Sequence, residues 1–183
     1  MTRLHFLIVI SVTFSLLFAP SLASAEIKVT PPPSWQAATT NNSTTMAWFQ
    51  NSTKSVFAII KAPGNMAFPM MFVGPFMSQY LEQKGVLESA DQISFGHRNH
   101  GYRYLLNLSS PSELANSSGL ISQSGLLPKI PQGYDVPFKG MLILTEKLDG
   151  LYAIVFLSPK ENFDSILNEI NPTIDSIQFN SVE

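Results

Sequence analysis

The sequence contains no cysteine among its 183 residues. This absence excludes disulfide bonds, thiolate metal ligands, a cysteine nucleophile and lipid attachment through cysteine. Charged residues are also scarce, at 13% of the chain against about a quarter in most proteins, and the formal net charge is −2. Nucleic-acid binding depends largely on cationic contacts to phosphate, so a weakly acidic chain without a basic run predicts no nucleic-acid partner.

Motifs specific to common enzyme classes are missing as well. The chain has no G-x-S-x-G elbow, no P-loop and no dinucleotide fingerprint. We therefore expect a non-catalytic protein without a cofactor. The alternative is an extracytoplasmic hydrolase with His97 or His100 as its base, because these two histidines remain once an N-terminal signal is removed.

Long apolar runs are confined to the N-terminus. Residues 1–25 have the three parts of a secretory signal peptide: the cation Arg3, the apolar stretch Leu4–Ala19, and the small residues Ala23 and Ala25 around Ser24. This pattern predicts cleavage before Glu26. It also predicts a secreted protein that works in a periplasm-like space or at a cell surface.

A permanent N-terminal membrane anchor is the alternative to cleavage. A spanning helix needs about 20 mainly apolar residues. The apolar stretch here is shorter and is interrupted by polar side chains, namely His5, Ser11, Thr13 and Ser15. We therefore expect cleavage rather than anchoring.

Asparagine, serine and threonine provide much of the polar surface. Five Asn-x-Ser/Thr triplets result, at Asn41, Asn42, Asn51, Asn107 and Asn116. In a secreted protein such triplets can accept glycans where the host has the machinery. A surface rich in these residues also generates the triplets by chance, so both interpretations stay open.

Residues 26–183 are long enough for one domain with its own core. Apolar, β-favouring runs separated by turn residues predict three hairpins: Met46–Gln50 with Ser55–Lys61, Gln92–His97 with Gly101–Asn107, and Met141–Glu146 with Leu151–Leu157. The last two strands are apolar on consecutive residues, which predicts cover on both faces. Residues 109–137 form a long Ser/Gly/Pro-rich stretch without a period, and we expect a loop there.

Two helices are predicted. The first covers Phe76–Lys84, with Gly85 as its stop. The second follows a cap at Ser158, with Pro159 at the first helical position and Glu161 completing a capping box. Its apolar stripe consists of Phe163, Ile166, Leu167 and Ile170, and Pro172 interrupts it. Strands outnumber helices, so the fold class is α+β, an antiparallel sheet with helices packed on it.

This order of elements resembles the PsbP-like proteins, exported α/β/α sandwich domains related to the extrinsic photosystem II subunit. The resemblance also includes the Pro33-Ser34-Trp35 turn and the closing segment Pro172–Phe179. It implies a non-catalytic domain that binds or stabilises a partner beyond a membrane. It carries over no catalytic residue, and the basic N-terminal arm that docks the photosynthetic partner is missing here.

The segment Met66–Met77 is unusually rich in methionine and phenylalanine among Pro and Gly. We expect its first part, through Phe72, to be a loop. Three interpretations remain: side chains packed in the core, a thioether site for Cu(I), or an apolar lip for a partner. The partner would be an unknown protein, membrane-associated proteins included, or a small apolar ligand. The candidate binding residues are Met66, Phe68, Met70, Met71 and Phe72.

His97 and His100 flank a predicted turn with the sequence H-R-N-H. Neutral imidazoles three residues apart can share a cation, but two ligands do not define a site. The alternative is two polar side chains at an exposed hairpin tip. We therefore expect no metal, with these histidines as the weak candidates.

Overall fold

The structure is a computed structural model of the full chain. It describes residues 26–38, 45–62, 69–111, 113–114 and 136–180. The predicted signal peptide, most of the predicted loop at 109–137, and Met66, Phe68, Asn41, Asn42 and Asn116 lie outside these residues. The two glycan candidates that the structure describes, Asn51 and Asn107, are both exposed.

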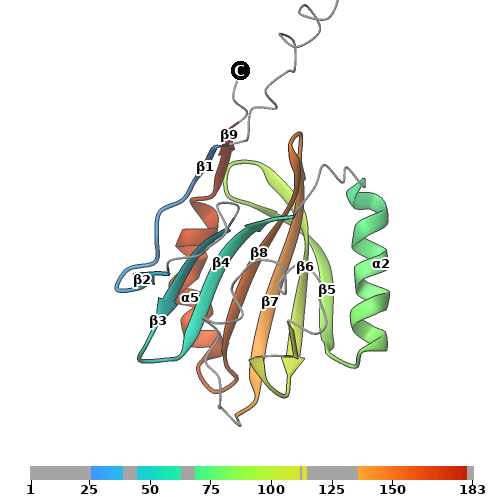
Figure 1. Ribbon diagram of the computed structural model, residues 1–183. Helices are drawn as coiled ribbons and strands as arrows, with labels where there is room; N and C mark the ends of the chain where they lie inside the picture. The colour runs from blue at the N-terminus through green and yellow to red at the C-terminus, as the bar shows by residue number, and fades with distance from the viewer. Residues whose placement is uncertain (1–25, 39–44, 63–68, 112, 115–135, 181–183) are drawn as a thin grey trace, which may run out of the picture.

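The core of the fold is one antiparallel sheet with the strand order β2-β3-β4-β8-β7-β6-β5 (Figure 1). Its strands are β2 (Gln36–Ala37), β3 (Thr45–Gln50), β4 (Ser55–Lys61), β5 (Leu87–Phe95), β6 (Asn99–Leu108), β7 (Phe138–Lys147) and β8 (Gly150–Pro159). The three predicted hairpins are confirmed as β3–β4, β5–β6 and β7–β8. A separate pair joins β1 (Glu26–Lys28) to β9 (Gln178–Asn180) near the chain ends.

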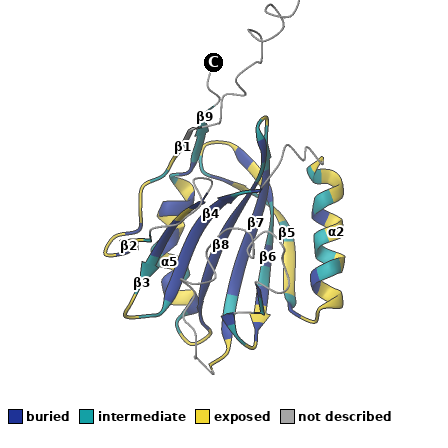
Figure 2. Cartoon of the chain, in the orientation of Figure 1, coloured by how far each residue is buried: buried dark blue, intermediate teal, exposed yellow. Residues whose placement is uncertain are grey.

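The central strands are covered on both faces, as their unbroken apolar runs predict. Every residue of β4 except Lys61 is buried, and β8 is buried except at Leu151. Helix α2 (Met70–Gln83) packs on one face with the cluster that contains Leu81 and Tyr104. Helix α5 (Phe163–Asp175) packs on the other. Figure 2 shows the buried strands between the two helices. The predicted α+β class, as an α/β/α sandwich, is confirmed.

The turn between β5 and β6 lies earlier than predicted. It consists of residues 96–98, where Gly96 and Arg98 have positive φ angles of 52° and 61°. His100 is therefore a strand residue, and His97, which was predicted as the last residue of the first strand, lies in the turn. The reason is Asn99, whose buried side chain donates to the carbonyl of Ile177 at 3.1 Å and so brings the strand start forward.

Helix α2 begins at Met70, so the predicted start at Phe76 and the predicted loop through Phe72 are wrong. Its N-cap residue, Pro69, has no side chain that can cap, and the Met70 N–H instead donates to Glu146 Oε2 at 3.1 Å. A carboxylate at this end also favours the helix dipole. Pro75 is tolerated early in the helix, where it removes one backbone hydrogen bond.

Helix α5 also differs from the prediction at both ends. Ser158 does not cap it, because Ser158 belongs to β8 and its hydroxyl pairs with that of Ser55 at 2.9 Å. The N-cap residue is Asn162, and the helix continues through Pro172 to Asp175. The stripe itself is confirmed for Phe163, Ile166 and Ile170, which are buried, while Leu167 is half-buried and packs at the cluster edge.

None of the helices in the described part of the chain is long and apolar enough to cross a membrane.

Phe163 supports a direct test of the α5 packing. It is 1% exposed, and its ring stacks on Phe156 with the centroids 5.1 Å apart. We expect Phe163→Ala to lower the free energy of unfolding by about 3–5 kcal/mol, as truncation of a buried aromatic side chain does. The half-buried Leu167 is the matched comparison, and Leu167→Ala should cost less. Equal urea midpoints for wild type and Phe163→Ala would contradict this packing.

Candidate functional site

Helix α2 sits unusually close to the sheet at Gly74. A Cβ atom at this position would lie 2.4 Å from the Tyr102 ring, so a larger residue would displace the helix or the ring. The buried Tyr104 hydroxyl donates to the Gly74 carbonyl at 2.9 Å, and Ser78 donates to the same oxygen at 3.2 Å. Burial raises the pKa of Tyr104 well above its ordinary value, so this donor keeps its proton.

A groove of about 510 Å³ opens where the first turn of α2 meets β5 and β6. Two of its lining residues come from α2, three from β5 and three from β6. They are Met70, Met71, Gln92, Ile93, Ser94, His100, Gly101 and Tyr102. The register pairs Gln92 with Tyr102 and Ser94 with His100, so these four side chains share one face of the sheet.

Two consecutive residues of β7 hold the two walls of the groove. The Thr145 hydroxyl donates to the His100 carbonyl at 2.7 Å, and the Glu146 carboxylate accepts the Met70 N–H. Across the β5–β6 pair, Ser94 Oγ lies 3.0 Å from His100 Nδ1. The groove therefore has one wall on the helix and one on the strands, and the same strand positions both.

Next to the groove, the outer face of the first two turns of α2 is apolar, whereas the exposed residues further along the helix are Gln79, Glu82 and Gln83. Met71, Phe72 and Phe76 are 68%, 63% and 68% exposed, respectively. Met70 is half-buried and packs against the core cluster on this side of the sheet. In Figure 2, α2 lies at the outside of the molecule, and exposed residues alternate with intermediate and buried ones along its ribbon.

The structure thus brings together candidate residues from two separate segments of the sequence. Met70, Met71 and His100 line one groove, whereas Phe72 and His97 do not. Sequence analysis missed Tyr102 in the groove and Phe76 on the outer face of α2. The pairing of Ser94 with His100 and of Gln92 with Tyr102 could have come from a correct β5–β6 register.

The Ser94–His100 hydrogen bond bears on the hydrolase alternative. It resembles a nucleophile beside a base, but both residues are exposed. A serine hydrolase also needs a group that orients the base and donors for the oxyanion. Within the described residues, no three His, Cys, Asp or Glu side chains gather at one place.

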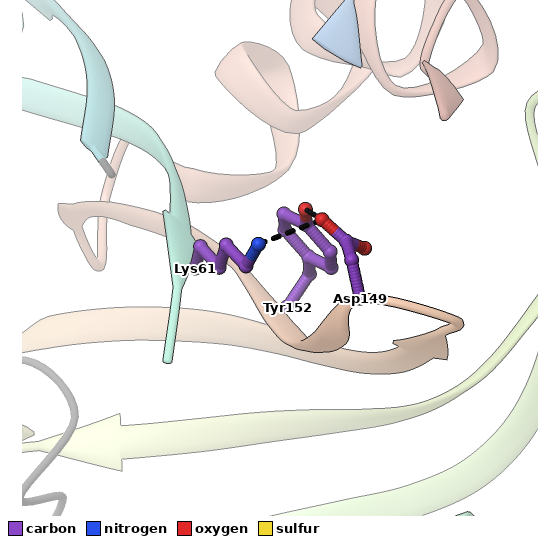
Figure 3. A network of polar contacts seen from close by, with 3 residues as sticks. All are labelled: Lys61, Asp149 and Tyr152. Carbon is purple, nitrogen blue, oxygen red and sulfur yellow. Dashed lines mark hydrogen bonds and ion pairs between the residues drawn. The ribbon is translucent and has the colours of Figure 1, made fainter. Parts of the chain in front are cut away.

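A second polar cluster lies at the end of β4 and the start of β8. Lys61 Nζ and the Tyr152 hydroxyl both reach Asp149 Oδ2, each at 2.7 Å (Figure 3). Burial, the hydrogen bond to Asp149 and the charge of Asp149 all raise the pKa of Tyr152. An activated phenol needs the opposite shift, so Tyr152 is a proton-retaining donor that fastens the β7–β8 turn.

The same end of the sheet holds strand β9 in place. The Tyr152 ring contacts the ring of Phe179 in β9, with the centroids 4.8 Å apart. Lys147 Nζ lies 5.0 Å from the Phe179 ring centroid and donates to Asn99 at 2.6 Å. Burial lowers the pKa of Lys147. These contacts connect β9 to the main sheet and have a structural role.

Comparison with known proteins bears on the fold alone. No protein-family model and no curated protein sequence matches the chain. A crystal structure from Bacteroides thetaiotaomicron VPI-5482 has a TM-score of 0.51 and 10% identity, over 86% of this chain and 48% of that one. The chain therefore spans about half the length of that protein.

Two further neighbours are more distant. The solution structure of cyanobacterial PsbP from Synechocystis sp. PCC 6803 has a TM-score of 0.47 and 10% identity, over 88% of this chain and 95% of that one. The Saccharomyces cerevisiae Ran-binding protein Mog1p has a TM-score of 0.40 and 10% identity, over 84% and 87%. A PsbP structure is thus among the neighbours, in line with the sequence resemblance. At such identities no residue's role transfers to this chain.

Tyr104 gives a pH-dependent test of how α2 is held. Its folded-state pKa lies above the ordinary 10.0, so above about pH 10 the unfolded chain loses this proton while the folded chain keeps it. Stability should therefore fall as the pH rises through this range. Tyr104→Phe removes that contribution. As the pH rises, the unfolding free energy of the variant should therefore fall less steeply than that of wild type, by up to about 1.4 kcal/mol per pH unit. Urea unfolding from about pH 8 to about pH 11 measures this, and parallel profiles would contradict it.

Proposed function

We propose that this protein is an exported, non-catalytic binding domain that docks a partner protein through the outer face of α2. The observation that carries the proposal is the exposure of Met71, Phe72 and Phe76 on one helix. Contiguous apolar surface on a single domain is uncommon without a use. Aromatic side chains and methionine are also enriched at protein interfaces.

The second helix shows that the fold does not require such a surface. Helix α5 covers the opposite face of the sheet in the same way, yet its outward positions are polar, with Asp164, Ser165 and Asn168 exposed. Both helices bury an apolar side against the sheet. Covering the sheet therefore does not explain the exposed side chains of α2.

The shape of the surface favours a protein over a small apolar ligand. Small-molecule sites are concave and bury most of the ligand. Phe72 and Phe76 lie on the outside of a helix and do not line the groove. A complementary apolar surface on a larger partner, membrane-associated proteins included, would cover them.

Export rests on the sequence of residues 1–25. The first described strand is compatible with cleavage before Glu26, since Glu26 is the first residue of β1 and pairs with Asn180. Removal of residues 1–25 would leave that strand intact. We expect the exported protein to begin at Glu26, within about two residues of the small-residue signal. N-terminal sequencing of the protein from its host tests this, and a chain that starts at Met1 or Thr2 would contradict it.

The exposed apolar side chains Met71, Phe72 and Phe76 form the proposed docking face, which is tested by Phe72→Ser combined with Phe76→Ser. Both side chains are exposed, so the double variant should keep a melting temperature close to that of wild type. It should also lose partners that the tagged wild-type protein retains from its native host, as measured by quantitative mass spectrometry.

Leu148→Ser is the matched control. Leu148 is 98% exposed in the β7–β8 turn and does not belong to α2, so this variant removes an exposed apolar side chain outside the tested helix. It should retain the partners. A double variant that binds like the control would overturn the proposal. So would one that melts about ten degrees or more below wild type, which at this chain length corresponds to roughly 3–5 kcal/mol.

A further inference from the structure

We propose that the groove is a Cu(I) site in which the thioethers of Met70 and Met71 and the imidazole of His100 are the ligands. The juxtaposition that supports it is the presence of all three side chains in one groove, although His100 is 29 or more positions away from both methionines in the sequence. The inference goes beyond the docking face and does not depend on it.

The donor set favours a soft monovalent cation. Thioether sulfur is an uncharged, polarizable ligand that selects Cu(I), and imidazole also suits copper. The described residues that line the groove include no Asp or Glu. Hard cations such as Mg²⁺ and Ca²⁺, which need several oxygen ligands, are therefore poorly served there.

His100 is oriented for this role by its neighbour. Ser94 Oγ lies 3.0 Å from His100 Nδ1, and an Nδ1–H that donates to the hydroxyl leaves Nε2 with its lone pair. Metal-binding histidines commonly use their second nitrogen in such a bond, which sets the tautomer and the ring orientation. The cross-strand register of Ser94 with His100 makes this contact a fixed feature of the hairpin.

The two sides of the site are also held in advance of any ligand. Glu146 accepts the N–H of Met70, and Thr145 donates to the carbonyl of His100. These anchors are adjacent in β7, so the helix start and the strand cannot shift independently. A site held this way loses little conformational freedom when the cation binds.

Apolar packing alone does not account for these side chains. Met71 is 68% exposed and His100 is exposed as well, so neither contributes much to the core. Met70 is half-buried, which places one thioether on the core side of the groove and one on the solvent side. Cu(I) bound between them would be partly shielded from water.

Competition with a chromophoric Cu(I) chelator under anaerobic, reducing conditions tests the proposal. The wild-type protein should take up one Cu(I) per chain. Met70→Leu with Met71→Leu keeps the size and apolar character of both side chains and removes both sulfurs. Its affinity should fall by at least the roughly 10–100-fold that loss of a second-shell partner typically costs.

His100→Gln should weaken binding to a similar degree, and Ser94→Ala by about tenfold through loss of the orienting contact. Two controls match these changes. His97→Gln alters the other histidine of the hairpin, and Met46→Leu alters an exposed methionine on β3. Both controls should bind like wild type. Melting curves without copper identify any variant that fails for lack of folding.

NMR of the methionine methyl groups gives a second measurement that does not depend on variants. On addition of Cu(I), or of Ag(I) as an air-stable substitute, the ε-methyl signals of Met70 and Met71 should shift together. Those of Met46, Met77 and Met141 should not. Sub-stoichiometric uptake, equal affinity in the Met70/Met71 variant, or shifts spread over all methionines would overturn the site. If the Phe72/Phe76 variant loses its partners but still takes up copper, the result would support a copper site that is independent of the docking face.

Discussion

The fold depends on a sheet that is apolar on both faces. Alternate residues of β4, β7 and β8 belong to opposite clusters, with Ile60 on the α2 side and Ile59 on the α5 side. Such a sheet cannot leave either face to water, because each exposed face would forfeit the burial that drives folding. Two helices on opposite sides are the simplest cover. The α/β/α layering therefore follows from the composition of three strands rather than from the helices themselves.

Sequence analysis succeeded where the signal was local. The β3–β4 and β7–β8 hairpins follow from adjacent apolar runs around short polar turns, and the α5 stripe follows from helical spacing. Element boundaries were less accurate. Ser158 and Glu161 form a plausible capping box in sequence, yet the Ser158 hydroxyl pairs with Ser55, which is 103 positions away. A tertiary hydrogen bond overrode a local one.

The same cause explains why the candidate site was only partly found. The Gly74-Pro75 pair and the preceding Pro69 suggested a loop, but the carboxylate of Glu146, 76 positions away, caps the helix start. With that cap, Met70 and Met71 form the first turn of α2 instead of an irregular segment. The β5–β6 turn was placed a few residues late, which hid the pairing of Ser94 with His100. Each half of the groove was visible in the sequence, and their proximity was not.

The position of the groove follows from the constraint on the sheet. An unpaired polar side chain is costly on the central strands. Most positions there pack apolar side chains, and the buried polar residues Ser55, Thr145 and Ser158 are hydrogen-bonded. Ser94 and His100 stand instead on β5 and the adjoining end of β6, at the edge of the sheet and the margin of the helix that covers it. There the first turn of α2 contributes Met70 and Met71 to the groove that His100 also lines. Soft ligands suit this boundary, since a thioether carries no charge and tolerates both the core side and the water side. The inner side of α2 thus covers one face of the sheet, while its first turn and its outer face remain available for binding.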